Sequence, residues 1–236
     1  MIKNFDELNS KICDCSKSFD AKMVGENGKR AIVLCGGTGC LSSNSAEIQD
    51  KFTELVKEHK LEDKVSVNKV GCFGFCSQGP FVKIYPEDTL YRLVTLDDVE
   101  EIFEKDIINH EVVERLLYIE PATKEQVIKQ DDINFYKKQV RVALHGCGQI
   151  NPEDIEEALG FDAFKGLIKA LSMSREDVIK EVLDSGLRGR GGGGFPTGRK
   201  WQFAFAQPDG EKYVVCNGDE GDPGAFMDRS ILEGNP

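Results

Sequence analysis

The sequence predicts an α/β fold of the α+β type, in which helices pack on a mixed sheet. Three observations support this: a short β-branched run at 30–35, apolar residues at helical spacing in 44–60, and strand-like alternation at 64–71. Residues 80–94 then predict a hairpin, and 95–110 predict a closing helix. This order of elements is typical of one compact domain of about 85 residues.

The first predicted helix has clear local signals. Its apolar face holds Ile48, Phe52, Leu55 and Val56. Asn44 or Ser45 can cap its N-terminus. The hairpin is expected to turn at Pro86-Glu87-Asp88.

A second unit is predicted further along the chain. We expect a strand at Gln139–Leu144, helices at about 153–171 and 174–186, and a strand at 212–217. Ser174 is expected to cap the second of these helices, and Gly186 to close it. The chain therefore divides into an N-terminal extension (1–27), a first domain (28–115), a linker (116–135) and the start of a second domain (136–236), which looks incomplete. We expect Cys13 and Cys15 to precede the first stable element.

Composition limits the classes of function. The chain has 236 residues, a formal net charge of −11 and 40% hydrophobic residues, which suffices for a packed core. No basic stripe is present, so we expect no nucleic-acid partner. No signal peptide and no transmembrane run are visible, so we expect a cytoplasmic protein. Eight cysteines in that compartment favour metal or redox chemistry over disulfides.

Four cysteines form two glycine-rich pairs. Cys35 and Cys40 are separated by four residues, and Cys72 and Cys76 by three. Both pairs follow predicted strands, and the neighbouring glycines let backbone N–H groups approach sulfur. Spacing alone leaves an iron–sulfur cluster, a zinc ion, buried structural thiols and two disulfides open.

The stretches "GGTGC" and "GCFGFCSQGP" around these cysteines resemble the thioredoxin-like [2Fe-2S] ferredoxin domain, found in the 24-kDa-type subunit of complex I and in soluble NAD-linked hydrogenases. The resemblance covers roughly residues 28–115. It implies a thioredoxin-like fold and a [2Fe-2S] cluster held by Cys35, Cys40, Cys72 and Cys76.

A second glycine cluster, "GLRGRGGGGFPTGRKW", occupies residues 186–201. It contains G-x-G-x-x-G, but a helix is expected before it and an aromatic stretch after it, so the usual dinucleotide fingerprint does not apply. Exposed glycine N–H groups beside Arg188, Arg190, Arg199 and Lys200 nevertheless favour an anion. A flexible surface loop is the alternative.

Aromatic and acidic residues follow this cluster. Phe195, Trp201, Phe203 and Phe205 suit either a core or stacking on a planar ring. Asn217, Asp219 and Glu220 would lie at the carboxyl end of the predicted strand, where ligands commonly bind. A solvated acidic turn is the simpler alternative for that stretch.

"RGRGGGGFPTGRKW" and "CNGDEGDPGAFMDR" together resemble the flavin- and NADH-binding subunit (51-kDa type) of complex I over roughly residues 136–236. The resemblance implies FMN bound by Gly189, Arg190, Gly191, Gly192, Lys200, Asn217, Asp219 and Glu220. It implies NAD(H), or NADP(H), near Gly193, Phe195, Phe203 and Asp222. Gly193 and Asp222 stand where the respiratory subunit usually has alanine and glutamate.

Both resemblances in one chain imply an electron-transfer subunit that exchanges hydride between NAD(H) and FMN and relays single electrons through a [2Fe-2S] cluster. The fused arrangement resembles the beta subunit of soluble, electron-bifurcating or NAD(P)-linked [FeFe]-hydrogenases. Implied partners are other iron–sulfur, hydrogenase or dehydrogenase subunits, NAD(P)H and, in some relatives, ferredoxin. We expect this chain to be an N-terminal fragment, with [4Fe-4S] clusters only in a missing C-terminal part.

Alternative functions remain open from the sequence. They are a subunit of formate dehydrogenase or respiratory NADH dehydrogenase, a non-catalytic ferredoxin-like carrier, and a zinc-stapled interaction module. Cys147 and Cys216 are expected to be packing thiols.

Overall fold

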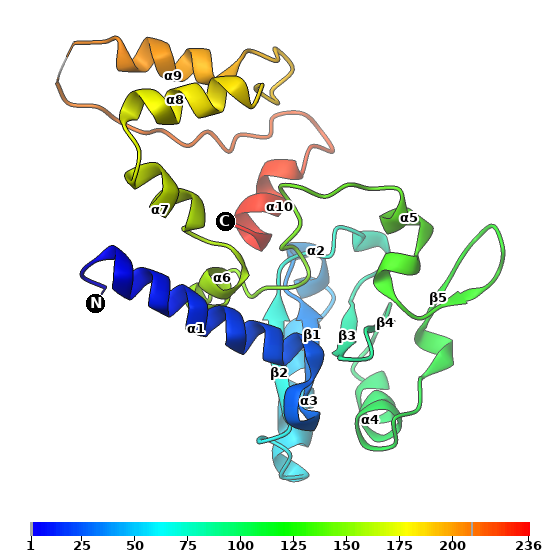
Figure 1. Cartoon of the computed structure of the whole chain (residues 1–236). Coiled ribbons are helices and arrows are strands. Elements are labelled where there is room, and N and C mark those ends of the chain that lie inside the picture. Colours follow the sequence, from blue (N-terminus) through cyan, green and yellow to red (C-terminus); the bar gives the residue numbers. More distant parts are fainter. Residues whose placement is uncertain (1, 209) are drawn as a thin grey trace. The chain divides into compact units, whose positions relative to one another are not determined.

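The computed structural model describes residues 2–208 and 210–236 (Figure 1). They form a larger compact unit, up to residue 161 together with 218–236, and a smaller one of 162–217. The units divide the chain differently from the predicted domains, because 136–161 and 218–236 fold with the cysteine-rich part. None of the helices among the described residues has the length and apolar character needed to cross a membrane.

The larger unit is built on a four-stranded sheet in the order β2-β1-β3-β4. Its strands are β1 (Arg30–Cys35), β2 (Val65–Val70), β3 (Val82–Tyr85) and β4 (Thr89–Tyr91). β1 pairs in parallel with β2 and antiparallel with β3, which pairs antiparallel with β4. Every residue of β1 is buried, as expected for a central strand. The predicted strands at 30–35 and 64–71 and the predicted hairpin are confirmed.

Helices connect and cover these strands. α3 (Ser45–Glu58) links β1 to β2 and buries Ile48, Phe52 and Val56 in the core. It begins after Asn44 as predicted, but Asn44 lies in the left-handed region (φ 64°) and its side chain makes no capping hydrogen bond to this described helix. α4 (Asp98–Ile102) continues into a π-helical turn, η3 (Phe103–Ile108), which together match the helix predicted at 95–110.

A buried polar network fastens η3 to the sheet. The Arg30 guanidinium pairs with the Asp106 carboxylate and also donates to the Asp106 carbonyl. The Tyr91 hydroxyl donates to the same carboxylate and accepts from the Val113 N–H at 3.1 Å. Burial, followed by the hydrogen bond to Asp106, raises the pKa of Tyr91, so the phenol stays protonated.

The N-terminal residues differ from expectation. Residues 5–24 form a long helix, α1 (Phe5–Val24), capped by the Asn4 side chain and closed by Gly25 at φ 68°. Its buried face packs on α6 (Ile155–Phe161), where a Cβ on Gly160 would lie 2.6 Å from the Cys15 carbonyl oxygen. Cys15 is therefore a buried packing residue of this helix, and Cys13 is exposed.

The segment expected to be a linker also packs on the sheet. The Leu90 N–H donates to the Ile128 carbonyl at 2.8 Å, and the Arg92 N–H to the Leu116 carbonyl at 3.0 Å, so this segment covers the outer edge of β4. Its short elements are η4 (Glu114–Leu116), β5 (Tyr118–Ile119), β6 (Gln126–Val127), η5 (Gln130–Asp132) and α5 (Asn134–Lys137).

Two predicted strands are absent from the second half. Residues 139–144 and 212–217 form no strand, and the side chains of Val140 and Val214 are almost fully exposed. β-branched residues favour a strand only when a neighbouring strand pairs with it, and no neighbour exists here among the described residues. The helices of this half are α7 (Lys165–Leu171), α8 (Arg175–Asp184), α9 (Thr197–Phe205) and α10 (Met227–Gly234). Ser174 caps α8 and Gly186 follows it at φ 67°, as predicted.

Candidate functional site

The sheet brings the four paired cysteines to one edge of the larger unit. Cys35 is the last residue of β1 and lies opposite Val70, the last residue of β2. Because these strands are parallel, the loops that leave them emerge side by side. Cys40 follows in the short helix α2 (Thr38–Leu41), and Cys76 opens the turn η2 (Cys76–Gln78). We call the segments 36–40 and 71–79 the cysteine loops.

The thiols are close enough to share one centre. The Sγ atoms of Cys72 and Cys76 are 3.9 Å apart. Two thiolates bound to one tetrahedral metal at about 2.3 Å would lie roughly 3.8 Å apart. The Cys35 thiol is hydrogen-bonded to both Cys40 and Cys72, which joins the two pairs.

Glycines shape the space around the sulfurs. A Cβ on Gly79 would lie 2.5 Å from Cys40 Sγ, and a Cβ on Gly37 would lie 3.1 Å from Cys72 Sγ. The Gly74 N–H donates to Cys72 Sγ at 3.3 Å. The structure therefore combines close backbone approach with an N–H donor to sulfur, an arrangement that stabilises metal-bound thiolate.

The electrostatics of the free thiols disfavour several negative charges at this edge. The hydrogen bond with Cys40, together with burial, raises the pKa of Cys35 to about 12, and its counterpart lowers the pKa of Cys40. The hydrogen bond with Cys35 and burial raise the pKa of Cys72. Burial and the neighbouring Cys72 raise the pKa of Cys76, and the Arg229 guanidinium opposes that rise. Bound cations would offset the same repulsion.

The donor set fits an iron–sulfur cluster. It consists of four thiols in two pairs, three of them buried, with Cys76 exposed. Over residues 2–208 and 210–236, no three His, Cys, Asp or Glu side chains are grouped so that they could hold a metal ion directly. A [2Fe-2S] cluster spreads its ligands over two irons and bridging sulfides, so four thiols need not converge on one point.

The second glycine cluster lies in the smaller unit as a loop between α8 and α9. Its base is closed by the Gly189 N–H, which donates to the Phe195 carbonyl at 2.9 Å, and by the Arg188 guanidinium, which donates to the Gly194 carbonyl at 3.2 Å. A Cβ on Gly191, or on the three glycines after it, would meet no described atom within 4 Å. The tip of the loop is therefore open to an incoming group.

A helix follows this loop, which corrects the expectation of a merely aromatic stretch. α9 carries Lys200, Trp201, Phe203 and Phe205, and its aromatic side chains are 42% to 60% exposed. The rings of Phe195 and Phe203 lie 6.4 Å apart. Core packing therefore does not account for most of the aromatic surface, although Trp201 lines an apolar cavity of about 440 Å³ with residues of α7 and α8.

The acidic stretch after residue 216 has a structural role at one position. The Glu220 carboxylate accepts from the N–H of Asp228 at 2.7 Å and of Arg229 at 3.3 Å, so it caps α10. Because no strand forms at 212–217, Asn217, Asp219 and Glu220 do not lie at a strand end. The residues predicted to bind FMN and NAD(H) fall in both units, with Asp219, Glu220 and Asp222 in the larger one.

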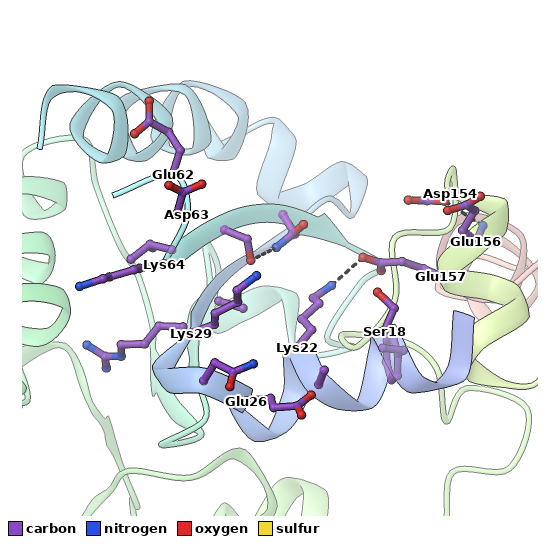
Figure 2. Close-up of a pocket in the computed structure, with 18 of the residues that line it drawn as sticks. Ser18, Lys22, Glu26, Lys29, Glu62, Asp63, Lys64, Asp154, Glu156 and Glu157 are labelled. Atoms are coloured by element: carbon purple, nitrogen blue, oxygen red, sulfur yellow. Dashed lines mark hydrogen bonds and ion pairs between the residues drawn. The ribbon is translucent and has the colours of Figure 1, made fainter. Parts of the chain in front are cut away.

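A polar cleft of about 450 Å³ lies between α1 and the beginning of β2, apart from the predicted site residues (Figure 2). Its walls carry both signs of charge, including Lys64 and Glu62. Lys22 and Glu157 form an ion pair of 2.6 Å across one side, drawn as a dashed line in Figure 2. The mixed charges select no particular ligand class.

Sequence reasoning missed two residues beside the cysteines. The Thr38 hydroxyl, in the first cysteine loop, donates to both carboxylate oxygens of Glu233 at 3.0 Å. Cys147 is buried, and its thiol lies 3.6 Å from the Ser230 carbonyl, in keeping with the predicted packing role. Local sequence holds no signal for the Thr38 contact, because its partner is 195 positions away.

Two family models match separate parts of the chain. The model described as thioredoxin-like [2Fe-2S] ferredoxin matches residues 17–106. The chain is 54% identical over 77 residues to a 2Fe-2S ferredoxin of Clostridium pasteurianum, which covers 33% of this chain and 76% of that protein. This chain belongs to the thioredoxin-like [2Fe-2S] ferredoxin family. The model described as the Nuo51 FMN-binding domain matches residues 182–236 of this family member, so both resemblances are confirmed.

Longer relatives match smaller shares of their own length. The NADP-reducing hydrogenase subunit HndC of Solidesulfovibrio fructosivorans is 52% identical over 100 residues, 42% of this chain and 20% of that one. An NADH-quinone oxidoreductase subunit of Aquifex aeolicus is 52% identical over 82 residues, 35% and 19% respectively. The chain thus spans about a fifth of each. A solved thioredoxin-like [2Fe-2S] ferredoxin from Aquifex aeolicus is 30% identical and covers 37% of this chain and 94% of that one, with a TM-score of 0.35.

Proposed function

We propose that this chain is part of an NAD(P)H-linked electron-transfer subunit, of hydrogenase or complex I type, that carries a [2Fe-2S] cluster and FMN. The observation that carries the proposal is the meeting of Cys35, Cys40, Cys72 and Cys76 at one glycine-lined edge. The match of 182–236 to the FMN-binding domain adds the flavin. A soluble, bifurcating hydrogenase complex is the specific assembly we propose.

Each part of the chain has a proposed role. The four thiolates hold the cluster within a ferredoxin module of 28–115, and 136–236 begin the flavin module. The open N–H groups of the glycine loop and Lys200 hold the flavin phosphate. Asn217, Asp219 and Glu220 accept hydrogen bonds from flavin hydroxyls, and Phe195, Phe203 and Asp222 bound the nicotinamide. When bound, FMN supplies the exchange between two-electron and one-electron chemistry.

The test is anaerobic purification of the chain followed by absorption spectra before and after adding NADH. The proposal predicts cluster bands and a flavin band that both bleach with NADH. Cluster bands that bleach only with dithionite would contradict the flavin part. A colourless protein that contains zinc would contradict the whole proposal.

A second candidate function is a ferredoxin-like electron carrier without flavin chemistry. It is favoured by the division of the predicted flavin residues between two units and by the absence of the strand expected at 212–217. The flavin content of the purified protein distinguishes the two candidates.

A further inference from the structure

The last helix of the chain packs directly on the cysteine loops. α10 belongs to the part that matches the FMN-binding domain, yet it folds within the larger unit. A Cβ on Gly71 would lie 2.5 Å from the Gly234 Cα, and a Cβ on Gly234 would lie 3.5 Å from the Cys72 nitrogen. The two backbones are therefore in contact next to a cluster ligand, and Figure 1 shows α10 beside α2.

A charged pair on α10 faces the first cysteine loop. The Glu233 carboxylate accepts the Thr38 hydroxyl and lies 3.8 Å from the Arg229 Nε, one helical turn away. That Nε is buried and has no hydrogen-bond partner among the residues that the structure describes. A buried guanidinium nitrogen without a hydrogen-bonding partner is costly and calls for a negative group nearby.

The position of Thr38 brings this pair close to the thiols. Thr38 lies between two glycines of the loop. A Cβ on the first, Gly37, would lie 3.1 Å from Cys72 Sγ, and a Cβ on the second, Gly39, would lie 3.8 Å from Cys76 Sγ. Arg229 and Glu233 therefore add one positive and one negative charge beside the ligands of the proposed cluster.

We infer that Arg229 and Glu233 set the reduction potential of the cluster, so that a helix of the flavin-type segment tunes the ferredoxin module. Reduction adds one negative charge to the cluster and its four thiolates. Arg229 stabilises that charge, and Glu233 opposes it and holds Arg229 in place through the helix. The inference rests on the proposed function, because it requires the cluster to be bound.

The test is a redox titration of the cluster in the full chain, followed by its EPR signal under anaerobic conditions. Arg229→Met is expected to lower the equilibrium constant for reduction about tenfold, which for a one-electron couple is about 59 mV. Glu233→Gln is expected to move the potential in the opposite direction. Arg229→Lys keeps the charge and is expected to restore most of the wild-type potential.

Lys105→Met is the matched control. Lys105 forms an i,i+4 pair with Glu101, as Arg229 does with Glu233, but it lies in η3, next to α4 at the other end of the sheet from α2 in Figure 1. Its potential is expected to equal that of the wild type.

Two outcomes overturn different claims. Equal potentials in the wild type, Arg229→Met and Glu233→Gln, with full cluster content in all three, would overturn this inference and leave the proposed function standing. A wild-type chain without iron or an EPR signal on reduction would overturn the proposed function itself. Shifts of the same sign in both variants would indicate general loosening of α10, and would also overturn the inference.

Discussion

A Cβ on Gly79 would lie only 2.5 Å from the sulfur of Cys40. The second cysteine loop therefore passes the first so closely that no side chain fits between them. A cluster in this space would be enclosed by backbone on that side, which keeps water from the sulfurs and leaves N–H groups facing them.

Gly79→Ala is expected to remove most of the bound iron, because the new methyl group must displace Cys40 or the loop. Gly39→Ala is the matched control in the same site, since its Cβ would make ordinary contact with Cys76 Sγ at 3.8 Å. Iron and acid-labile sulfide per chain measure the outcome. Equal iron in the two variants would show that the close approach is unimportant.

Asp106→Asn is expected to lower the free energy of unfolding by about 3–5 kcal/mol, because Arg30 would remain charged and buried without its partner. Glu87→Gln is the control, since Glu87 is a more exposed partner of the same guanidinium and such pairs contribute about 0–1 kcal/mol. Urea unfolding of the cluster-loaded chain under anaerobic conditions measures both. A loss below about 1 kcal/mol for Asp106→Asn would contradict the account.

Acid stability is expected to depend on Asp98. Burial alone would raise the pKa of this carboxyl, but hydrogen bonds from Thr95 and Arg115 outweigh it and hold the pKa below its usual range. A carboxyl whose folded pKa is lowered stabilises the fold above its unfolded pKa, near 3.9, and loses that contribution as pH falls through the folded value.

Asp98→Asn is therefore expected to be less stable than the wild type at pH 7, with the difference shrinking below about pH 4. The exposed neighbour Asp97 provides the control, as Asp97→Asn. Thermal unfolding between pH 3 and pH 7 measures the difference. A constant difference across that range would contradict the assigned role.

Gly191→Ala tests the glycine loop. The free chain has room for the methyl group, so the helix content from circular dichroism is expected to stay unchanged. Flavin retention is expected to fall several-fold, because the methyl group occupies space that a phosphate would approach. Gly166→Ala, in α7, also meets no described atom within 4 Å and serves as the control. Equal flavin retention in both variants would place the phosphate elsewhere.

The sequence predicts elements well where local pattern and tertiary environment agree. β1 has a continuous β-branched run and lies in the sheet interior, and α3 carries its apolar side chains on one face. α1 is harder to predict because its sequence is mostly polar, although Ile12, Cys15 and Phe19 repeat at helical spacing. That weak pattern, with Asn4 before it and Gly25 after it, is the signal that the sequence offers.

The predicted strand at 212–217 shows the opposite error. Its valines suit a strand, but a strand is stable only beside another one, and local propensity cannot supply that neighbour. The site shows the same limit. The cysteine and glycine spacing predicts which thiols meet, whereas the contact of Thr38 with Glu233 depends on the tertiary fold.

Iron and acid-labile sulfide per chain, measured after anaerobic purification, test the central claim most directly. The account predicts about two irons and two sulfides per chain, with absorption bands that bleach on reduction by dithionite. Loss of both in Cys72→Ser would assign the cluster to the cysteine loops. About one zinc per chain and no sulfide would contradict the account, because four thiolates would then hold a single structural ion.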